Sequence, residues 1–305
     1  MKSLNFALLA VENNDFQAEQ VKVARSAADR LGVHLEIIHI EHDAIQQSEQ
    51  ILKLLHSPAV RPDAILFEPV GTPLVQAAKV AASMGVGWAI LNRESVDYIP
   101  SLRQEHHNAV FSVSASHAEV GQIQGAQIAR LLPQGGCVLY IQGPSDNEAS
   151  TRRAAGMQAA KPANVELRTL KGLWTKQSAH KSVGSWLKLS IAQELPLGAV
   201  VAQNDAMALG AREAFQESTK VAGDRWRKLP FIGCDGLPGS GQAAVISGLL
   251  AATVVTPPNA GRAVEVLASA LRTGEQPPPC ILIEPTSFPA LSLLRPIALP
   301  ASSRA

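Results

Sequence analysis

The chain has 305 residues, of which 46% are hydrophobic, 17% charged and 4% aromatic. Its formal net charge is +1, from 27 basic and 26 acidic side chains, so no strong field gathers nucleic acid or an anionic membrane. No apolar run reaches the ~18 residues that a membrane-spanning helix needs. The length is sufficient for two domains, each with its own core. These features predict a soluble globular protein that does not insert into a membrane.

The amino-terminal residues predict a β-strand and no export segment. Lys2 is followed by a short apolar run, residues 4–11, and then by four polar residues, 12–15. A secretory signal needs ~7–15 apolar residues and a small-residue cleavage site after a basic start. We therefore expect the chain as written to be cytoplasmic, and periplasmic if an upstream signal is missing from this start site.

Apolar runs of strand length alternate with helical patterns along the chain, which predicts the α/β class. The helical patterns of residues 17–31 and 258–272 are followed by Gly32 and Gly274, which are typical of helix C-caps. Thr72 and Pro73 are typical of another helix start. The strand-like runs are residues 4–11, 33–40, 63–68, 86–92, 108–113, 136–142, 165–170, 198–203, 229–233, 249–255 and 280–284.

Two distant segments, residues 63–94 and 198–237, follow the same plan: an apolar run, a polar turn, an Ala-rich helix and a second apolar run. This pattern predicts a strand–helix–strand unit of a parallel sheet, present twice. Ligands of such sheets bind beyond the carboxyl ends of the strands. The polar residues at the four predicted ends are Glu68, Asn92 with Arg93, Asn204 with Asp205, and Asp235. We therefore expect a polar small molecule to be held between two lobes.

The sequence contains no recognisable catalytic, metal or cofactor motif. The three cysteines, Cys137, Cys234 and Cys280, have no CxxC spacing, and two adjacent histidines, His106 and His107, make a poor metal pair. No GxSxG nucleophile elbow, GxGxxG fingerprint or phosphate-binding loop occurs. We expect a protein that is not an enzyme, with no cofactor and no metal.

Five motifs occur along the chain in the order NNDFQ (13–17), AILNRE (89–94), QNDAMALGA (203–211), FIGCDG (231–236) and GLLAATV (248–254). Together they resemble the motifs of type I periplasmic binding proteins, above all the ribose-binding group and the effector domains of LacI-type repressors. The resemblance implies two similar Rossmann-like lobes with parallel sheets, joined by three crossover segments and closing on a ligand. It implies residues 1–106 plus 257–282 for the amino-terminal lobe, 107–256 plus 283–295 for the other, and a tail of 296–305.

The resemblance also implies a set of ligand-binding residues. Four of them depart from the ribose binders: Glu68 replaces an Asn, Asn92 an Asp, Thr151 an Arg and Thr256 a Gln. The pocket is therefore expected to take a different sugar, a polyol or a related small polar molecule. The full set is Asn14, Phe16, Glu68, Asn92, Arg93, Thr151, Trp174, Asn204, Asp235 and Thr256.

The function implied is that of a non-enzymatic substrate-binding protein whose closed form is read by an ABC transporter permease or a sensor protein. Two alternatives remain. One is a sugar- or nucleotide-modifying α/β enzyme, which the missing catalytic motifs disfavour. The other is a repressor-type effector domain without its DNA-binding part, since the first predicted strand begins at Leu4 and precludes a preceding helix-turn-helix.

Overall fold

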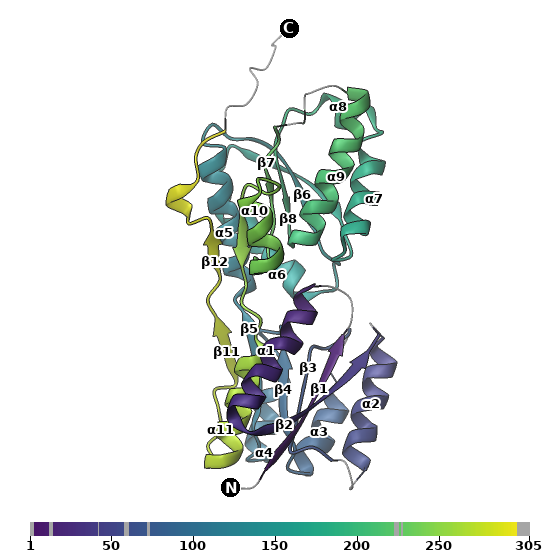
Figure 1. Ribbon diagram of the computed structural model, residues 1–305, viewed down its shortest axis with the longest axis vertical. Helices are drawn as coiled ribbons and strands as arrows, with labels where there is room; N and C mark the ends of the chain where they lie inside the picture. Colours follow the sequence, from purple (N-terminus) through teal and green to yellow (C-terminus); the bar gives the residue numbers. More distant parts are fainter. Residues whose placement is uncertain are drawn as a thin grey trace. The chain divides into compact units, whose positions relative to one another are not determined.

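The computed structural model describes residues 3–11, 15–41, 43–57, 61–71, 74–222, 226 and 228–297. The chain divides into two compact units (Figure 1). Unit 1 comprises Met1–Ala115 and Pro258–Ile283, and unit 2 comprises Ser116–Pro257 and Glu284–Ala305. The chain therefore passes from one unit to the other three times. Both units are α/β structures built on a parallel sheet, as the alternation of patterns predicts.

Unit 1 contains a six-stranded sheet in the order β11-β5-β4-β3-β1-β2, in which every pair is parallel. The central strands β3, β4 and β5 are buried along their whole length, which explains the continuous apolar sequences of β3 and β4. The strands are β1 (Leu4–Val11), β2 (Val33–Ile40), β3 (Ala64–Phe67), β4 (Gly87–Leu91), β5 (Val110–Ala115) and β11 (Cys280–Ile283). The helices are α1 (Asp15–Leu31), α2 (Ala44–His56), α3 (Val75–Ser83), α4 (Ile99–Glu105) and α11 (Ala260–Thr273).

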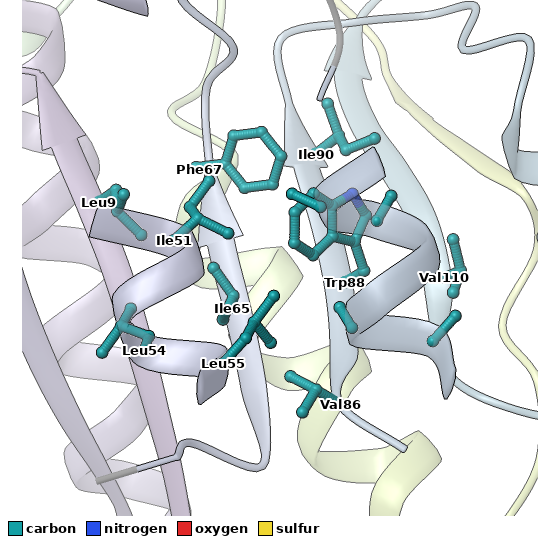
Figure 2. Close-up of a cluster of buried hydrophobic side chains, with 14 of the residues drawn as sticks. Leu9, Ile51, Leu54, Leu55, Ile65, Phe67, Val86, Trp88, Ile90 and Val110 are labelled. Carbon is teal, nitrogen blue, oxygen red and sulfur yellow. The ribbon is translucent and has the colours of Figure 1, made fainter. Parts of the chain in front are cut away.

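A hydrophobic core lies on each face of this sheet. Helices α2, α3 and α4 cover one face, where Phe67 and Trp88 meet edge to face with ring centroids 4.7 Å apart (Figure 2). Helices α1 and α11 cover the other face with small residues and leucines. Because helices lie on both faces, the carboxyl ends of the strands are where polar side chains can collect.

Unit 2 contains a four-stranded parallel sheet in the order β7-β6-β8-β9 and a short antiparallel pair, β10 with β12. Isolated parallel bridges, Ile232 with Ala252 and Asp235 with Val255, connect the segment that contains β10 to the end of β9. The strands are β6 (Gly136–Gln142), β7 (Val165–Lys171), β8 (Leu197–Ala202), β9 (Phe231–Ile232), β10 (Thr253–Val255) and β12 (Thr286–Phe288). The helices are α5 (His117–Leu131), α6 (Glu148–Ala160), α7 (Lys176–Trp186), α8 (Ser190–Glu194), α9 (Asp205–Ala222) and α10 (Ala243–Ile246).

Helices α5 and α6 approach each other so closely that glycines are required at their contact. A Cβ atom on Gly121 would lie 2.0 Å from the Arg153 carbonyl oxygen, and one on Gly156 would lie 2.0 Å from the Ala118 oxygen. Real side chains never tolerate such distances, so any larger residue would push the helices apart. The contact sets the position of Arg153, which α6 carries toward the strand ends.

The structure differs from the expected organisation in four places. The helix expected to start at Thr72 and Pro73 begins at Val75 with Leu74 as its N-cap, and Thr72 and Pro73 lie outside the described residues. Residues 107–115 were assigned to the second lobe, but β5 lies in unit 1, because it pairs with β4 and β11. The helix expected from Pro258 begins at Ala260 instead. Strand β12 was not predicted, since three residues carry too little pattern. Gly274, by contrast, is confirmed as a left-handed C-cap. Among the described helices, none has the length and apolar character to cross a bilayer.

Candidate functional site

At the strand ends of unit 1, Glu68 is the centre of a hydrogen-bonded group. It follows β3 and is half-buried. Its Oε2 accepts hydrogen bonds from Gln17 Nε2 on α1 (2.6 Å) and from Asn92 Nδ2 at the end of β4 (2.7 Å). Its Oε1 lies 3.9 Å from Arg93 Nη1. The carboxylate is therefore fixed by neighbours from two elements of the unit, α1 and the end of β4.

Arg93 and Asn92 are buried at the end of β4, with 9% and 8% of their surface exposed. The guanidinium of Arg93 donates to the backbone oxygens of Asn92 (3.1 Å) and Pro69 (2.9 Å). An arginine has five N–H donors, so these bonds orient its planar group without using all of them. The edge thus combines one guanidinium, one carboxylate and one amide.

At the strand ends of unit 2, Asn204 and Asp205 begin helix α9 and have separate tasks. Asn204 Oδ1 caps the helix by accepting from Met207 N (2.9 Å), and its Nδ2 donates to the Trp174 oxygen (2.8 Å). Asp205 accepts from the Gly236 N–H (2.8 Å) and the Thr253 hydroxyl (2.7 Å). Burial raises the pKa of the Asp205 carboxyl to about 7, although these two hydrogen bonds and the charge of Arg153 act to lower it. Asp205 therefore holds in place the loop that follows β9.

That loop carries Asp235, whose side chain is 18% exposed and lies 3.9 Å from Arg153 Nη1. Arg153 is 7% exposed, donates to the Gln203 oxygen (2.5 Å) and lies 5.7 Å above the ring of Trp174. An arginine over a tryptophan face is a cation–π contact, and it orients both groups. The strand ends of unit 2 thus combine a carboxylate, a guanidinium and an aromatic ring.

Left-handed backbone conformations coincide with three of the predicted site residues. Among the residues that the structure describes, the non-glycine positions with positive φ are Asn92 (58°), Trp174 (63°) and Asp235 (98°). Such conformations cost free energy in L-residues and are concentrated at functional sites. Each of the three follows a strand: Asn92 follows β4, Trp174 follows β7, and Asp235 follows β9.

Of the other four predicted residues, three have fewer contacts and one has no described position. Asn14 lies outside the described residues. Phe16 is half-buried in the first turn of α1. Thr151 is exposed on α6 and its hydroxyl donates to the Glu148 oxygen (3.0 Å), while Arg153 two residues later is the side chain that reaches Asp235. Thr256 is 2% exposed, and its hydroxyl has no hydrogen-bond partner within the described part of the chain.

Several residues of these edges were missed as site residues by the sequence reasoning. Gln203 joins the Gly143 N–H, the Tyr140 hydroxyl and the Ser150 oxygen, all between 2.8 and 2.9 Å. Gln17 donates to Glu68, Asn259 donates to Asn92, and Gln20 donates to Asn259. A polar residue inside an apolar helical stripe, such as Gln20, was the available signal. No group of three or more metal-ligating side chains occurs among the residues with described positions.

Comparisons with known proteins agree with this architecture. A family model described as a periplasmic binding protein domain matches residues 6–276. The ribose import binding protein of Salmonella typhimurium is 27% identical over 269 residues, covering 87% of this chain and 83% of that protein. The D-galactose/methyl-galactoside binding periplasmic protein of Haemophilus influenzae is 30% identical over 246 residues, covering 75% and 69%.

The fold also matches a solved structure, that of an ABC transporter periplasmic solute binding protein from Actinobacillus succinogenes with bound D-allose. The TM-score is 0.80 over 94% of this chain and 97% of that one, at 19% identity. At this identity the likeness establishes a shared fold.

Proposed function

The chain belongs to the periplasmic binding protein domain family, and from this premise we propose that it binds a sugar or a sugar-like polyol without transforming it. The relatives named above bind ribose and galactose, according to their names. The observation that best supports the proposal is that Asn92, Trp174 and Asp235 are held in left-handed conformations at strand ends. Strained residues in these positions are expected where a ligand, and not stability alone, has selected the conformation.

The chemistry of the strand ends suits a neutral polyhydroxylated ligand. Unit 1 contributes Glu68 with Arg93, and unit 2 contributes Asp235 with Arg153, each pair at 3.9 Å. In each unit one positive and one negative group face each other, so neither edge has a net charge from its pair. Carboxylates accept hydrogen bonds from hydroxyl groups, and guanidinium groups donate to hydroxyl oxygens. The ring of Trp174 offers an apolar surface for the C–H face of a sugar ring.

We propose the ligand-binding set as Phe16, Glu68, Asn92, Arg93, Trp174, Asn204, Asp235 and Thr256, with Asn14 and Thr151 as further members. Thr256 is included because its buried hydroxyl has no hydrogen-bond partner among the described residues. The carrier function requires a partner, and an ABC transporter permease is the partner that the import relatives suggest. A sensor protein is the alternative partner.

A thermal-shift screen tests the proposal with D-ribose, D-galactose, D-allose and myo-inositol. A ligand that binds only the folded protein stabilises it by RT ln(1 + [L]/Kd), about 2.7 kcal/mol at a hundredfold excess over Kd. At least one compound is expected to raise the melting temperature and to be recovered chemically unchanged. Conversion of the compound would establish an enzyme instead.

The place of action follows from a second experiment. The galactose-binding relative is periplasmic by name, and we propose the periplasm or the cytoplasm as the compartment in which this protein acts. Fractionation of cells that express the protein from its own locus decides between the two compartments. Recovery in the periplasm would contradict the cytoplasmic location and support a transporter partner.

A further inference from the structure

A row of buried amide side chains lies behind the strand ends of unit 1. Gln20, Asn259 and Asn92 are 3%, 1% and 8% exposed. The Ala260 N–H donates to Gln20 Oε1 (2.8 Å), and Gln20 Nε2 donates to Asn259 Oδ1 (3.0 Å). Asn259 Nδ2 then donates to Asn92 Oδ1 (2.6 Å), and Asn92 Nδ2 donates to Glu68 Oε2 (2.7 Å). Four consecutive hydrogen bonds thus connect a backbone N–H to the carboxylate.

The direction of this relay is determined at its two ends. A backbone N–H can only donate, and an ionised carboxylate can only accept. Each amide between them has one accepting end and one donating end. If the oxygen of Gln20 faces Ala260, its nitrogen must face Asn259, and the same rule passes on to Asn92. Rotating one amide by 180° would place like groups opposite each other at both of its ends, and buried groups without partners are costly.

The role of Asn259 in this relay is unusual for its position. It is the N-cap residue of α11, where an asparagine side chain commonly bonds to the helix's own N–H groups. Here its side chain makes no capping bond, and Gln20 of α1 accepts from the Ala260 N–H instead. The amide of Asn259 is thereby left to bond to Asn92. Its position in α11 is therefore better explained by the relay than by helix capping.

We propose that Gln20 and Asn259 are positioning residues that set the hydrogen-bond polarity of the ligand-binding strand ends in unit 1. They hold Asn92 with its N–H group toward Glu68, so that the carboxylate faces a donor and not a second acceptor. Glu68 Oε2 already accepts two hydrogen bonds, while its Oε1 lies 3.9 Å from Arg93 Nη1. The side chain of Glu68 is 23% exposed. This inference rests on the proposed function, and it specifies one group of the ligand: the group that contacts Glu68 must be a hydrogen-bond donor, such as a hydroxyl. An ether or ketone oxygen in the same place is rejected.

Gln20→Glu tests the relay in the ligand-free protein, because it replaces a donor by an acceptor without changing shape. Asn259 and Asn92 must then rotate, and the Asn92 oxygen faces Glu68. The variant is expected to melt on the order of 2–4 °C or more below the wild type. Adding Glu68→Gln supplies an N–H to the rotated Asn92, so the double variant is expected to melt above Gln20→Glu. If the effects of the two substitutions on the melting temperature were simply additive, the proposal would be overturned.

Direct charge repulsion between positions 20 and 68 could produce the same coupling, and a third substitution separates the two causes. Asn259→Leu interrupts the relay with an apolar side chain of similar size, and Asn259→Ala serves if the leucine variant does not fold. The coupling between positions 20 and 68 is expected to disappear in this background. Repulsion through space would persist there, and its persistence would overturn the relay.

Titration calorimetry with D-ribose, D-galactose and myo-inositol distinguishes failure of the relay from failure of the proposed function. The Kd of a sugar that binds the wild type is expected to rise about tenfold in Gln20→Glu. The reason is that the Glu68 carboxylate, which binds the sugar, loses the hydrogen bond from Asn92 that holds it in place. Additive melting temperatures with an unchanged Kd would remove the relay and leave the function standing. Coupling in the ligand-free protein without binding of any of the three sugars would support the relay and count against the proposed function.

Discussion

Two aspartates of unit 2 show how neighbouring residues of one type acquire different tasks. Asp205 is 4% exposed and accepts hydrogen bonds from Gly236 and Thr253, whereas Asp235 is partly exposed beside Arg153. Cβ atoms on Gly233 and Gly241 would lie 2.0 and 1.9 Å from the Asp205 carboxylate oxygens, so both positions must be glycine to admit it. Asp205 is thus part of the fold, and Asp235 is the aspartate that we propose binds the ligand.

Substitution by alanine is expected to separate these tasks. Asp205→Ala leaves the Gly236 N–H and the Thr253 hydroxyl without their acceptor and should lower the free energy of unfolding by about 2–4 kcal/mol. Asp235→Ala should weaken ligand binding about 10- to 150-fold and change the stability of the ligand-free protein far less. Chemical denaturation and calorimetry measure the two quantities. A large loss of stability with unchanged affinity in Asp235→Ala would exclude Asp235 from the site.

The raised pKa of Asp205 predicts a pH dependence of stability. Burial raises the pKa of the Asp205 carboxyl from its ordinary value of 3.8 to about 7 in the folded protein, so the folded state binds the proton more tightly than the unfolded state. The resulting stabilisation is complete below pH 3.8 and is lost as the pH rises through about 7. The free energy of unfolding of the wild type, relative to Asp205→Asn, should therefore fall between these values by at most about 1.4 kcal/mol per pH unit. Parallel pH profiles of the two proteins would contradict this.

At the scale of elements, the contact between α5 and α6 depends on glycines and positions Arg153. A Cβ atom on Gly156 would lie 2.0 Å from the Ala118 oxygen, which the backbone cannot avoid without moving α6. Gly184 on α7 provides a contrast, because a Cβ there meets no atom within 4 Å. The two glycines have the same helical propensity and opposite surroundings.

Alanine substitution at these two glycines should therefore have opposite signs. Gly156→Ala should destabilise the protein by about 1–3 kcal/mol, through overpacking. It should also weaken ligand binding by displacing Arg153. Gly184→Ala should stabilise by roughly 0.5–1 kcal/mol, the gain in helix propensity, and leave binding unchanged. Denaturation midpoints and calorimetry on both variants check this, and stabilisation by Gly156→Ala would refute the proposed closeness of the helices.

At the scale of the whole molecule, neither unit is a continuous piece of the chain. Helix α11 contributes Ala260, Ala263, Val264 and Leu267 to the core of unit 1, although it follows all but one strand of unit 2 in sequence. Strand β12 and Leu294 contribute to unit 2 from the end of the chain. Each core is therefore complete only when the segment after Pro257 is in place.

Truncation after Pro257 should accordingly prevent both units from folding. The fragment lacks α11 and β11 of unit 1 and β12 of unit 2, which leaves one face of the first sheet covered by α1 alone. We expect it to unfold without a cooperative transition and to bind a hydrophobic dye such as ANS, which the full chain should not. Addition of the separate peptide 258–305 is expected to restore part of the cooperativity. A cooperative transition in the fragment alone would contradict the shared cores.

The sequence by itself determined the class of fold, because strands buried on both faces must be continuous apolar runs, as β3, β4 and β8 are, and such runs alternate with helical patterns. It also indicated the strand ends where Glu68, Asn92, Arg93, Asn204 and Asp235 lie, since polar residues directly after such runs must emerge at one edge. Motif resemblance added the family.

Only the tertiary structure decided which sheet a strand joins and which polar groups meet. Residues 110–115 read as a strand in either lobe, and pairing with β4 and β11 places them in unit 1. Asn259 and Gln20 are 239 residues apart in sequence. Arg153 on α6 and Asp235 after β9 lie 3.9 Å apart in the structure, and no local sequence pattern connects the members of either pair. Hydrogen bonds and ion pairs depend on distances of a few ångströms, and the chain's own spacing carries no such distance between remote residues.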